Sequence, residues 1–253
     1  MRRFIVPGLA LLLLSVAMDA SSVEAGQYFV DSFDGPSLSP NLVDVDGTYR
    51  LGGGNLRNTG SRNYVRTFAA DYILQDFVAD LTYSVTTGGG PAGMFFGMGP
   101  GTKNSNFFDE PLQAVFFLDY AGDWPFFQGV DVRQWPDAGS QLLAENYYFS
   151  SGLINQGGFA RARIVKIGDS MTFSADLRFD GVQFRPQFQT TIDLSAQTPY
   201  LNATNSRLFF GSGSSPTTFH EFSITAVPEP NALVLALVGL LTTAGRLIVR
   251  RSN

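Results

Sequence analysis

The feature that most constrains the fold is a series of short segments in which apolar and polar residues alternate. Such alternation is typical of strands with one buried face, because successive side chains of a strand point to opposite sides. Between residues 26 and 226, which contain these segments, we find no stretch with the repeat of an amphipathic helix. The alternating segments cover residues 27–33, 64–68, 77–85, 94–98, 114–119, 129–135, 142–149, 159–167, 170–179, 183–189, 207–210 and 219–226.

Turn residues separate these segments, including Asp34-Gly35-Pro36, Gly168-Asp169 and Asp180-Gly181. Glycine, aspartate and proline favour tight turns for different backbone reasons. The two later turns predict an antiparallel meander that ends with a strand over residues 182–184. About a dozen strands without helices favour an all-β fold, a two-sheet antiparallel β-sandwich of jelly-roll type.

Two short echoes lie within the predicted strands. Residues 95–99 read Phe-Phe-Gly-Met-Gly and residues 209–213 read Phe-Phe-Gly-Ser-Gly, while Ala-Asp-Leu occurs at 79–81 and again at 175–177. We interpret them as marks of equivalent strands rather than of a true repeat.

Composition limits how the fold is stabilised and which sites it can carry. The 253 residues include no cysteine, which excludes disulfides, thiolate metal sites and thiol nucleophiles. Stability must come from a core, for which 23 Phe, nine Tyr and two Trp supply ample apolar area. The net charge of −5 and the lack of a basic stripe argue against nucleic acid as a partner.

The N-terminus has the pattern of a secretory signal peptide. Met1-Arg2-Arg3 is a charged start, Phe4–Met18 is mostly apolar, and small or β-branched residues precede a cleavage site after Ala25. We therefore predict a signal peptide over residues 1–25, read by the secretion machinery and removed by signal peptidase. The alternative is an uncleaved membrane anchor, which the short apolar run disfavours.

The C-terminus carries three marks in order: a Pro-Glu-Pro motif, a short apolar stretch over 232–245, and an arginine-rich end. It resembles the PEP-CTERM sorting signal, in which such a tail is processed by an exosortase, a membrane-embedded transpeptidase-like enzyme. The resemblance implies a sorting tail over 227–253, an exosortase-type partner, and passage through the inner membrane to the cell surface or extracellular matrix. Arg246 departs from the pattern by interrupting the apolar run. The implied signal residues are Val227, Pro228, Glu229, Pro230, Arg246, Arg250 and Arg251.

The length of the apolar stretch agrees with this interpretation. Its 14 residues would span about 21 Å as a helix, less than the ~30 Å hydrocarbon core. Leu247–Val249 can extend the transmembrane helix while Arg246 snorkels to the interface. The arginines then stay on the cytoplasmic side and the body faces outward. A plain single-pass anchor is the alternative.

The body, residues 26–226, is similar in its order of signals to the concanavalin A-like lectin/glucanase and laminin G-like groups. The resemblance implies a jelly roll, and it leaves activity open. It rests on Phe33-Asp34-Gly35 with Leu38, the glycine-rich stretch 51–56, the strand 93–99, the hairpin 168–181 and the closing strand 219–224.

Catalytic patterns are missing from the body. Glucanases of this group place two or more carboxylates on one strand, commonly as Glu-x-Asp-x-Glu, but Glu110, Glu145 and Glu221 do not begin that pattern. His220 is the single histidine, which excludes multi-histidine zinc sites, and no Gly-x-Ser-x-Gly motif occurs. We expect a protein that is not an enzyme.

Both tryptophans lie in one segment with carboxylates nearby, a mixture that suits a sugar ring stacked on an indole. We predict a ligand site formed by Asp119, Asp123, Trp124 and Trp135. The alternative is that both indoles belong to the core.

We expect no cofactor, with calcium as the one open alternative. Calcium prefers oxygen ligands, which Asp119, Asp123 and Asp131, or Asp44 and Asp46, can supply. Neither group has an EF-hand spacing.

The sequence therefore predicts an exported, non-enzymatic protein of the cell surface or matrix that binds polysaccharide. Two alternatives stay open: a glycan hydrolase or lyase on the same scaffold, and a structural matrix protein without a ligand.

Overall fold

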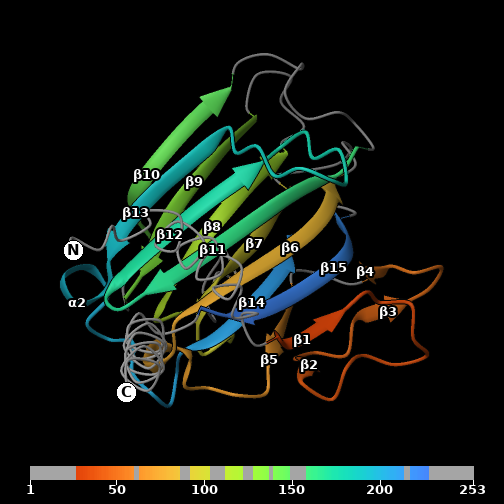
Figure 1. Cartoon of the computed structure of the whole chain (residues 1–253), viewed down its shortest axis with the longest axis horizontal. Coiled ribbons are helices and arrows are strands. Elements are labelled where there is room, and N and C mark those ends of the chain that lie inside the picture. Colours follow the sequence, from red (N-terminus) through yellow and green to blue (C-terminus); the bar gives the residue numbers. More distant parts are fainter. Residues whose placement is uncertain are drawn as a thin grey trace, which may run out of the picture. The chain divides into compact units, whose positions relative to one another are not determined.

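Two antiparallel sheets packed face to face form the body of the protein (Figure 1). The computed structural model describes residues 27–59, 63–85, 92–102, 112–121, 128–136, 139–148, 158–213 and 217–227. Within them, helix is limited to η1 (Tyr72–Leu74) and α2 (Leu194–Gln197). The predicted all-β sandwich is confirmed.

The segment Gln27–Ala226 forms one compact unit. The predicted signal peptide, and the predicted tail apart from Val227, lie outside the described residues. Among the residues that are described, no helix is both long and apolar enough to cross a membrane.

The first sheet, called sheet A here, lies in front in Figure 1. In spatial order its strands are β13 (Phe188–Asp193), β12 (Ser170–Asp176), β11 (Ala160–Ile167), β6 (Phe77–Val85), β15 (Thr217–Ala226), β4 (Leu56–Asn58) and β3 (Tyr49–Leu51), with β1 (Gln27–Asp31) beside β15.

The second sheet, sheet B, packs behind sheet A. Its strands in spatial order are β10 (Gln141–Tyr148), β9 (Gln128–Trp135), β8 (Ala114–Ala121), β7 (Ala92–Gly99), β14 (Arg207–Ser212), β5 (Asn63–Thr67) and β2 (Leu42–Asp44).

The main core lies between the two sheets and follows from the alternation of each strand. In β11, Ala160, Ala162 and Ile164 are buried in this core, and the residues between them point outward. Aromatic rings fill the centre: the ring centroids of Phe210 and Phe222 are 5.0 Å apart. Burial of this apolar surface supplies the main driving force for folding, since no disulfide is available.

Sheet B is also covered on its outer face. A second buried cluster there contains Tyr64, Phe95, Phe116, Leu118, Phe209 and Trp135, with Ala114. The two Phe-Phe-Gly echoes meet in this sheet, because β7 and β14 are antiparallel neighbours that place Phe209 opposite Gly97 and Phe95 opposite Gly211. A ring from each strand thus lies beside a glycine of the other.

One predicted strand is wrong. The chain does not turn at Asp180-Gly181 to pair residues 182–184 with β12; the partner of β12 is β13, with Ser170 opposite Asp193. Residues 177–187 instead form a loop, called the 177–187 loop. Asp180 Oδ1 accepts hydrogen bonds from the amides of Val182 and Gln183, which bends the chain away from an extended path.

Candidate functional site

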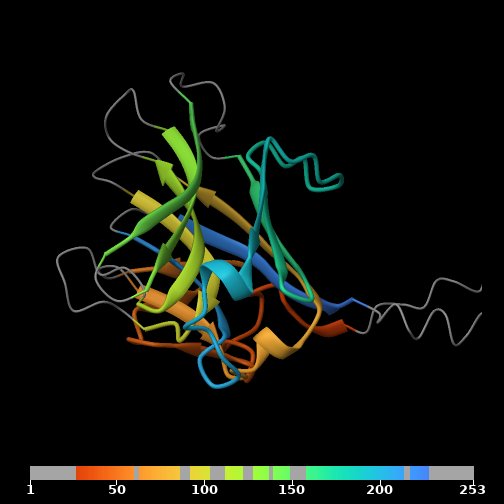
Figure 2. The same cartoon turned by 90° about the vertical axis from the view of Figure 1, so that its left-hand side faces the viewer.

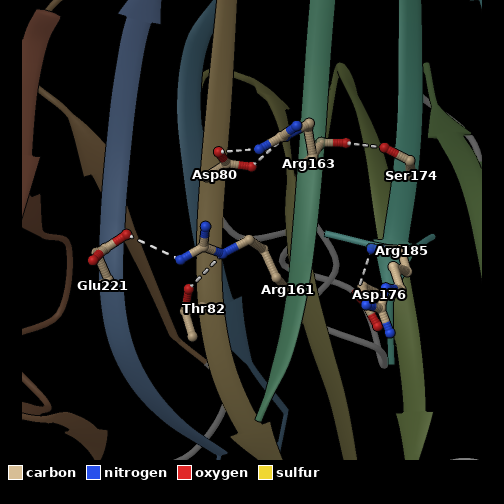
Figure 3. Close-up of polar contacts among 8 residues, drawn as sticks. All are labelled: Asp80, Thr82, Arg161, Arg163, Ser174, Asp176, Arg185 and Glu221. Atoms are coloured by element: carbon tan, nitrogen blue, oxygen red, sulfur yellow. Dashed lines mark hydrogen bonds and ion pairs between the residues drawn. The ribbon is translucent and has the colours of Figure 1, made fainter. Parts of the chain in front are cut away.

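The outer face of sheet A carries rows of polar side chains that lie across four neighbouring strands (Figure 3). Seven of them point outward from β15, β6, β11 and β12, where they alternate with core residues, and Arg185 belongs to the 177–187 loop. We call this surface the polar face. It consists of Asp80, Thr82, Arg161, Arg163, Ser174, Asp176, Arg185 and Glu221.

An ion pair between β6 and β11 forms the first row. Arg163 lies directly opposite Asp80 in the strand register. Its Nε donates to Oδ1 of Asp80 at 2.7 Å and its Nη2 donates to Oδ2 at 2.8 Å. Such a two-point contact fixes both side chains more firmly than a single hydrogen bond does. Ser174 Oγ extends the row by donating to the Arg163 carbonyl at 3.4 Å.

The second row joins β11, β6 and β15. Arg161 Nε donates to Thr82 Oγ1 at 3.0 Å, and its Nη2 contacts Glu221 Oε1 at 3.3 Å. Glu221 reaches this face because of an irregularity in the β15–β6 register between Phe219 and Glu221. A bulge of this kind re-aims the residues that follow it.

The 177–187 loop doubles back over the outside of sheet A (Figure 1, Figure 2). Asp176 holds its two ends: Oδ2 accepts from the Arg185 amide at 2.6 Å, and Oδ1 accepts from the Arg178 amide at 3.1 Å. The loop brings two rings onto the guanidinium groups of the polar face, since Phe179 lies 4.1 Å from Arg161 Cζ and Phe184 lies 4.4 Å from Arg163 Cζ.

These cation–π contacts restrain both guanidinium groups in addition to their hydrogen bonds with Asp80, Thr82 and Glu221. The polar face is therefore a fixed array of hydrogen-bond donors and acceptors rather than a set of mobile surface charges.

An exposed aromatic ring lies beside the second row. Phe159 precedes Arg161 by two residues, so both point to the same side of the sheet, and 48% of Phe159 is exposed. Its ring meets His220 edge-on, with centroids 4.7 Å apart. His220 Nε2 lies 2.9 Å from Ser84 Oγ. Burial lowers the pKa of His220, as does the nearby charge of Arg57, so this ring stays neutral at pH 7.

The hydrogen bonds of the polar face limit what its carboxylate Asp80 can do chemically. Both oxygens of Asp80 already accept hydrogen bonds from Arg163, so neither is free to carry the proton of a general acid. Guanidinium, carboxylate and hydroxyl groups in fixed positions can instead donate to and accept from the hydroxyls of a ligand.

The structure places Asp119 in the core rather than at a surface. Its strand neighbour Leu118 faces outward in the second cluster, and Asp119 points between the sheets, fully buried. Tyr83 Oη on the opposite sheet donates to its Oδ2 at 2.8 Å, while Oδ1 has no hydrogen-bond partner among the described residues. Burial raises the pKa of Asp119 to about 6, partly offset by the Tyr83 hydrogen bond.

Trp135 lies far from Asp119. In the β8–β9 register Trp135 is opposite Ala114, five residues along β8 from Asp119, which corresponds to about 17 Å. Trp135 faces the outer side of sheet B, belongs to the second cluster and is 5% exposed. The structure thus does not bring these two predicted residues together. Asp123 and Trp124 lie outside the described residues, and their role stays a prediction.

Of the acids considered for calcium, Asp119 and Asp131 are held apart, and Asp123 lies outside the described residues. Asp131 pairs with the outward-facing Leu118, so Asp119 and Asp131 lie on opposite faces of sheet B and cannot share one ion. Asp44 uses Oδ1 to accept from the amide of Gly47 and Oδ2 to accept from that of Tyr49, which shapes a turn. Across the described ranges, no group of three or more potential metal ligands occurs.

Comparisons with known proteins identify similar folds but no family for this chain. No protein-family model matches the chain. A search of curated proteins finds no match either.

Solved structures do resemble it. The lumenal domain of VIP36 bound to Ca²⁺ and mannose has 11% identity, covers 75% of this chain and 84% of its own, and gives a TM-score of 0.52. The CBM2 module of an evolved Dit protein from Lactobacillus casei BL23 phage J-1 has 10% identity and covers 80% of this chain and 97% of its own, with a TM-score of 0.52.

An enzyme is also among the similar structures. The xylan β-1,4-xylosidase from Bacillus halodurans C-125 has 12% identity and a TM-score of 0.55; 78% of this chain aligns with 38% of that one. At these identities the likeness shows a lectin-like β-sandwich and nothing about activity.

The sequence did contain a signal for the polar face. Alternate arginines at 161 and 163, and Asp80 with Thr82, have the spacing of residues that share one side of a strand. What was missing was the pairing of β11 with β6, two strands nearly eighty residues apart in the chain, which puts these side chains opposite one another.

Proposed function

We propose that this chain is an exported, non-enzymatic protein whose sandwich domain binds a neutral polysaccharide across the polar face. The observation that carries the proposal is the exposed ring of Phe159 beside the fixed row of Arg161, Thr82 and Glu221. A sugar ring stacks on an aromatic face while its hydroxyls exchange hydrogen bonds with neighbouring polar groups. Phe159 and the neighbouring polar face together supply both elements on one side of the same sheet.

The charge of the polar face favours a neutral ligand. Asp80 and Glu221 offset Arg161 and Arg163, and the buried Asp176 offsets Arg185, so these residues sum to no net charge that would attract an acidic or a basic polymer. The similar structures include a lumenal domain bound to mannose and a CBM2 module, which makes sugar the first ligand class to test.

A glycan hydrolase or lyase is the second candidate, because one similar structure is a xylosidase. Asp80 and Glu221 also project from adjacent strands, β6 and β15, on the same face. Hydrolysis needs one carboxyl to deliver a proton to the glycosidic oxygen. Arg163 donates to both oxygens of Asp80, and Arg161 contacts Glu221. Each carboxylate thus already has an arginine partner, which supports the binding proposal over hydrolysis.

We predict that Phe159→Ala lowers polysaccharide affinity about tenfold, because aromatic stacking contributes roughly 0.5–1.5 kcal/mol beyond the lost apolar area. An array of neutral and acidic polysaccharides identifies the ligand, and titration calorimetry measures affinity for both forms. Phe68→Ala is the matched control, since Phe68 is an exposed phenylalanine on a different connection.

Three other results would count against the proposal. Equal affinity of the two variants moves the site away from the polar face. Release of shortened sugars points to the enzyme, and the absence of binding to any polysaccharide points to a structural matrix protein.

We further propose that the C-terminal segment is a sorting signal that enters the inner membrane and is cut by an exosortase-type enzyme. The Pro-Glu-Pro motif precedes an apolar stretch and an arginine end, and proline keeps the motif extended and accessible.

Replacing both prolines of this motif, Pro228→Ala with Pro230→Ala, is expected to leave an unprocessed form in the membrane fraction of the native host. Mass spectrometry of the mature protein reads the outcome. A native mature protein that still ends in Arg251-Ser252-Asn253 contradicts the sorting proposal.

A further inference from the structure

The connection between β5 and β6 exposes two large apolar side chains. Phe68 and Leu74 are each 72% exposed, although the strands on both sides of them are well buried. Single exposed apolar residues are ordinary on protein surfaces. What distinguishes this pair is how firmly the backbone beneath them is held.

One end of the connection is fixed by three hydrogen bonds. The Phe68 amide donates to the Asn41 carbonyl at 2.7 Å. Arg207 Nη1 donates to the carbonyls of Thr67 and Phe68. The ring of Phe68 is therefore presented by an anchored backbone.

Ser206 fixes the middle of the connection. Its amide and its Oγ both donate to the Ala70 carbonyl at 2.9 Å. Its carbonyl accepts from the Tyr72 amide at 3.2 Å, and its Oγ accepts from the Ile73 amide at 3.0 Å. Tyr72 is buried against Phe77, so η1 cannot rotate to hide Leu74.

The chain leaves the sandwich at this same end. Ala226, the last residue of β15, lies opposite Phe77, the first residue of β6 and the third after Leu74. The apolar stretch of the C-terminal segment begins at Ala232. The six residues from Ala226 to Ala232 can extend over about 20 Å at most.

We propose that Phe68 and Leu74 dock this end of the sandwich onto a lipid bilayer surface while the C-terminal segment is in the membrane. The inference rests on the proposed membrane entry of that segment, which keeps the end within about 20 Å of the lipid. Fixed apolar side chains enter the boundary between headgroups and acyl chains, where burial of apolar area stabilises the bound state.

Charge selects the kind of lipid surface. Asp71 and Asp76 flank Leu74 in the same connection, while Arg207 lies against Phe68, and the chain as a whole carries a net charge of −5. Charges of both signs at this end give anionic lipid no uniform attraction, and the docking partner is a zwitterionic surface bound through apolar contacts. The binding is expected to persist at high salt, because charge screening weakens electrostatic contacts only.

Docking at this end has a consequence for the polar face. Thr82, in the row beside Phe159, lies five residues along β6 from Phe77, or about 17 Å. The proposed glycan site would then be held away from the lipid and open to polymer outside the cell.

The absence of cysteine allows a direct test in the full chain, because one introduced cysteine takes a polarity-sensitive fluorophore at a single position. Labels at Phe68→Cys, Leu74→Cys, Val182→Cys and Leu240→Cys are compared in phosphatidylcholine vesicles that carry quencher lipids at two depths. Val182 is the exposed control, on the 177–187 loop at the other end of β12.

Docking predicts a blue shift and loss of emission with the shallow quencher at positions 68 and 74, no change at 182, and loss with the deep quencher at 240. Emission at 68 and 74 that matches 182 while 240 is quenched overturns the docking alone. An unquenched label at 240 overturns membrane entry and docking together, without bearing on glycan binding. A blue shift at 68 and 74 without vesicles that grows with protein concentration assigns the surface to a second copy of this chain instead.

Discussion

Gly97→Ala is expected to destabilise the sandwich by about 3 kcal/mol or more, the upper part of the range for overpacked cores. A Cβ at this position would lie 2.2 Å from the Val115 carbonyl oxygen and 2.5 Å from Cβ of Phe116. The nearest atom belongs to the backbone of the neighbouring strand, so it cannot move aside as a flexible side chain could. The β7–β8 pairing must therefore shift.

Gly52→Ala is the matched control, because a Cβ there meets nothing within 4 Å and the residue has no positive φ. Chemical denaturation of the two variants and the parent protein measures the difference in free energy of unfolding. Equal stability of both variants would show that β7 and β8 approach less closely than the structure indicates.

The glycines of the two Phe-Phe-Gly segments have a packing role in sheet B. Gly97 lies between Phe116 and Phe209 on the outer face of sheet B, and Gly211 lies between Phe95 and Tyr64. Each glycine leaves room for the aromatic rings of the two neighbouring strands. The rings can therefore pack side by side on the outer face of sheet B. Sequence reasoning found equivalent strands, and the structure shows that they are also hydrogen-bonded neighbours.

Strand positions could be predicted well where alternation is strong. The segment 77–85 matches β6 at both ends, because its core and outward residues alternate without a break up to Leu81. Residues 182–184 do alternate, as Val-Gln-Phe, but the third strand of the predicted meander failed because Asp180 turns the chain there. The short strands β2, β3 and β4 were missed, since three residues carry too little periodicity to detect.

The candidate site was harder to predict because its contacts are long-range. Arg163 and Asp80 are 83 residues apart in the chain, and only the pairing of β11 with β6 brings them together. The tryptophan-rich segment was the stronger local signal. Composition could not reveal that Asp119 points into the core or that the outer face of sheet B is itself covered, which buries Trp135.

Asp119 gives the second large expected effect, a loss of stability as pH rises through the range from about 4 to about 6. Its pKa is raised to about 6 in the folded protein by burial, whereas an unfolded aspartate titrates near 3.8. The folded state therefore binds the extra proton within this window, and the free energy of unfolding falls with rising pH until the carboxyl is fully ionised. Two pKa units correspond to about 3 kcal/mol.

Asp119→Asn is expected to remove this dependence. The amide oxygen still accepts the Tyr83 hydroxyl but carries no charge at any pH, so burial costs no ionisation energy. Unfolding curves at a series of pH values from 4 to 8 give the free energy of unfolding for both proteins, and the difference between the two profiles isolates the contribution of Asp119. Exposed acids such as Asp180 contribute equally to both profiles. Backbone hydrogen bonds lower the pKa of Asp180, so its contribution to stability rises with pH, opposite to that of Asp119. If the two profiles run parallel between pH 4 and pH 6, the carboxyl titrates normally and has access to water in the folded protein.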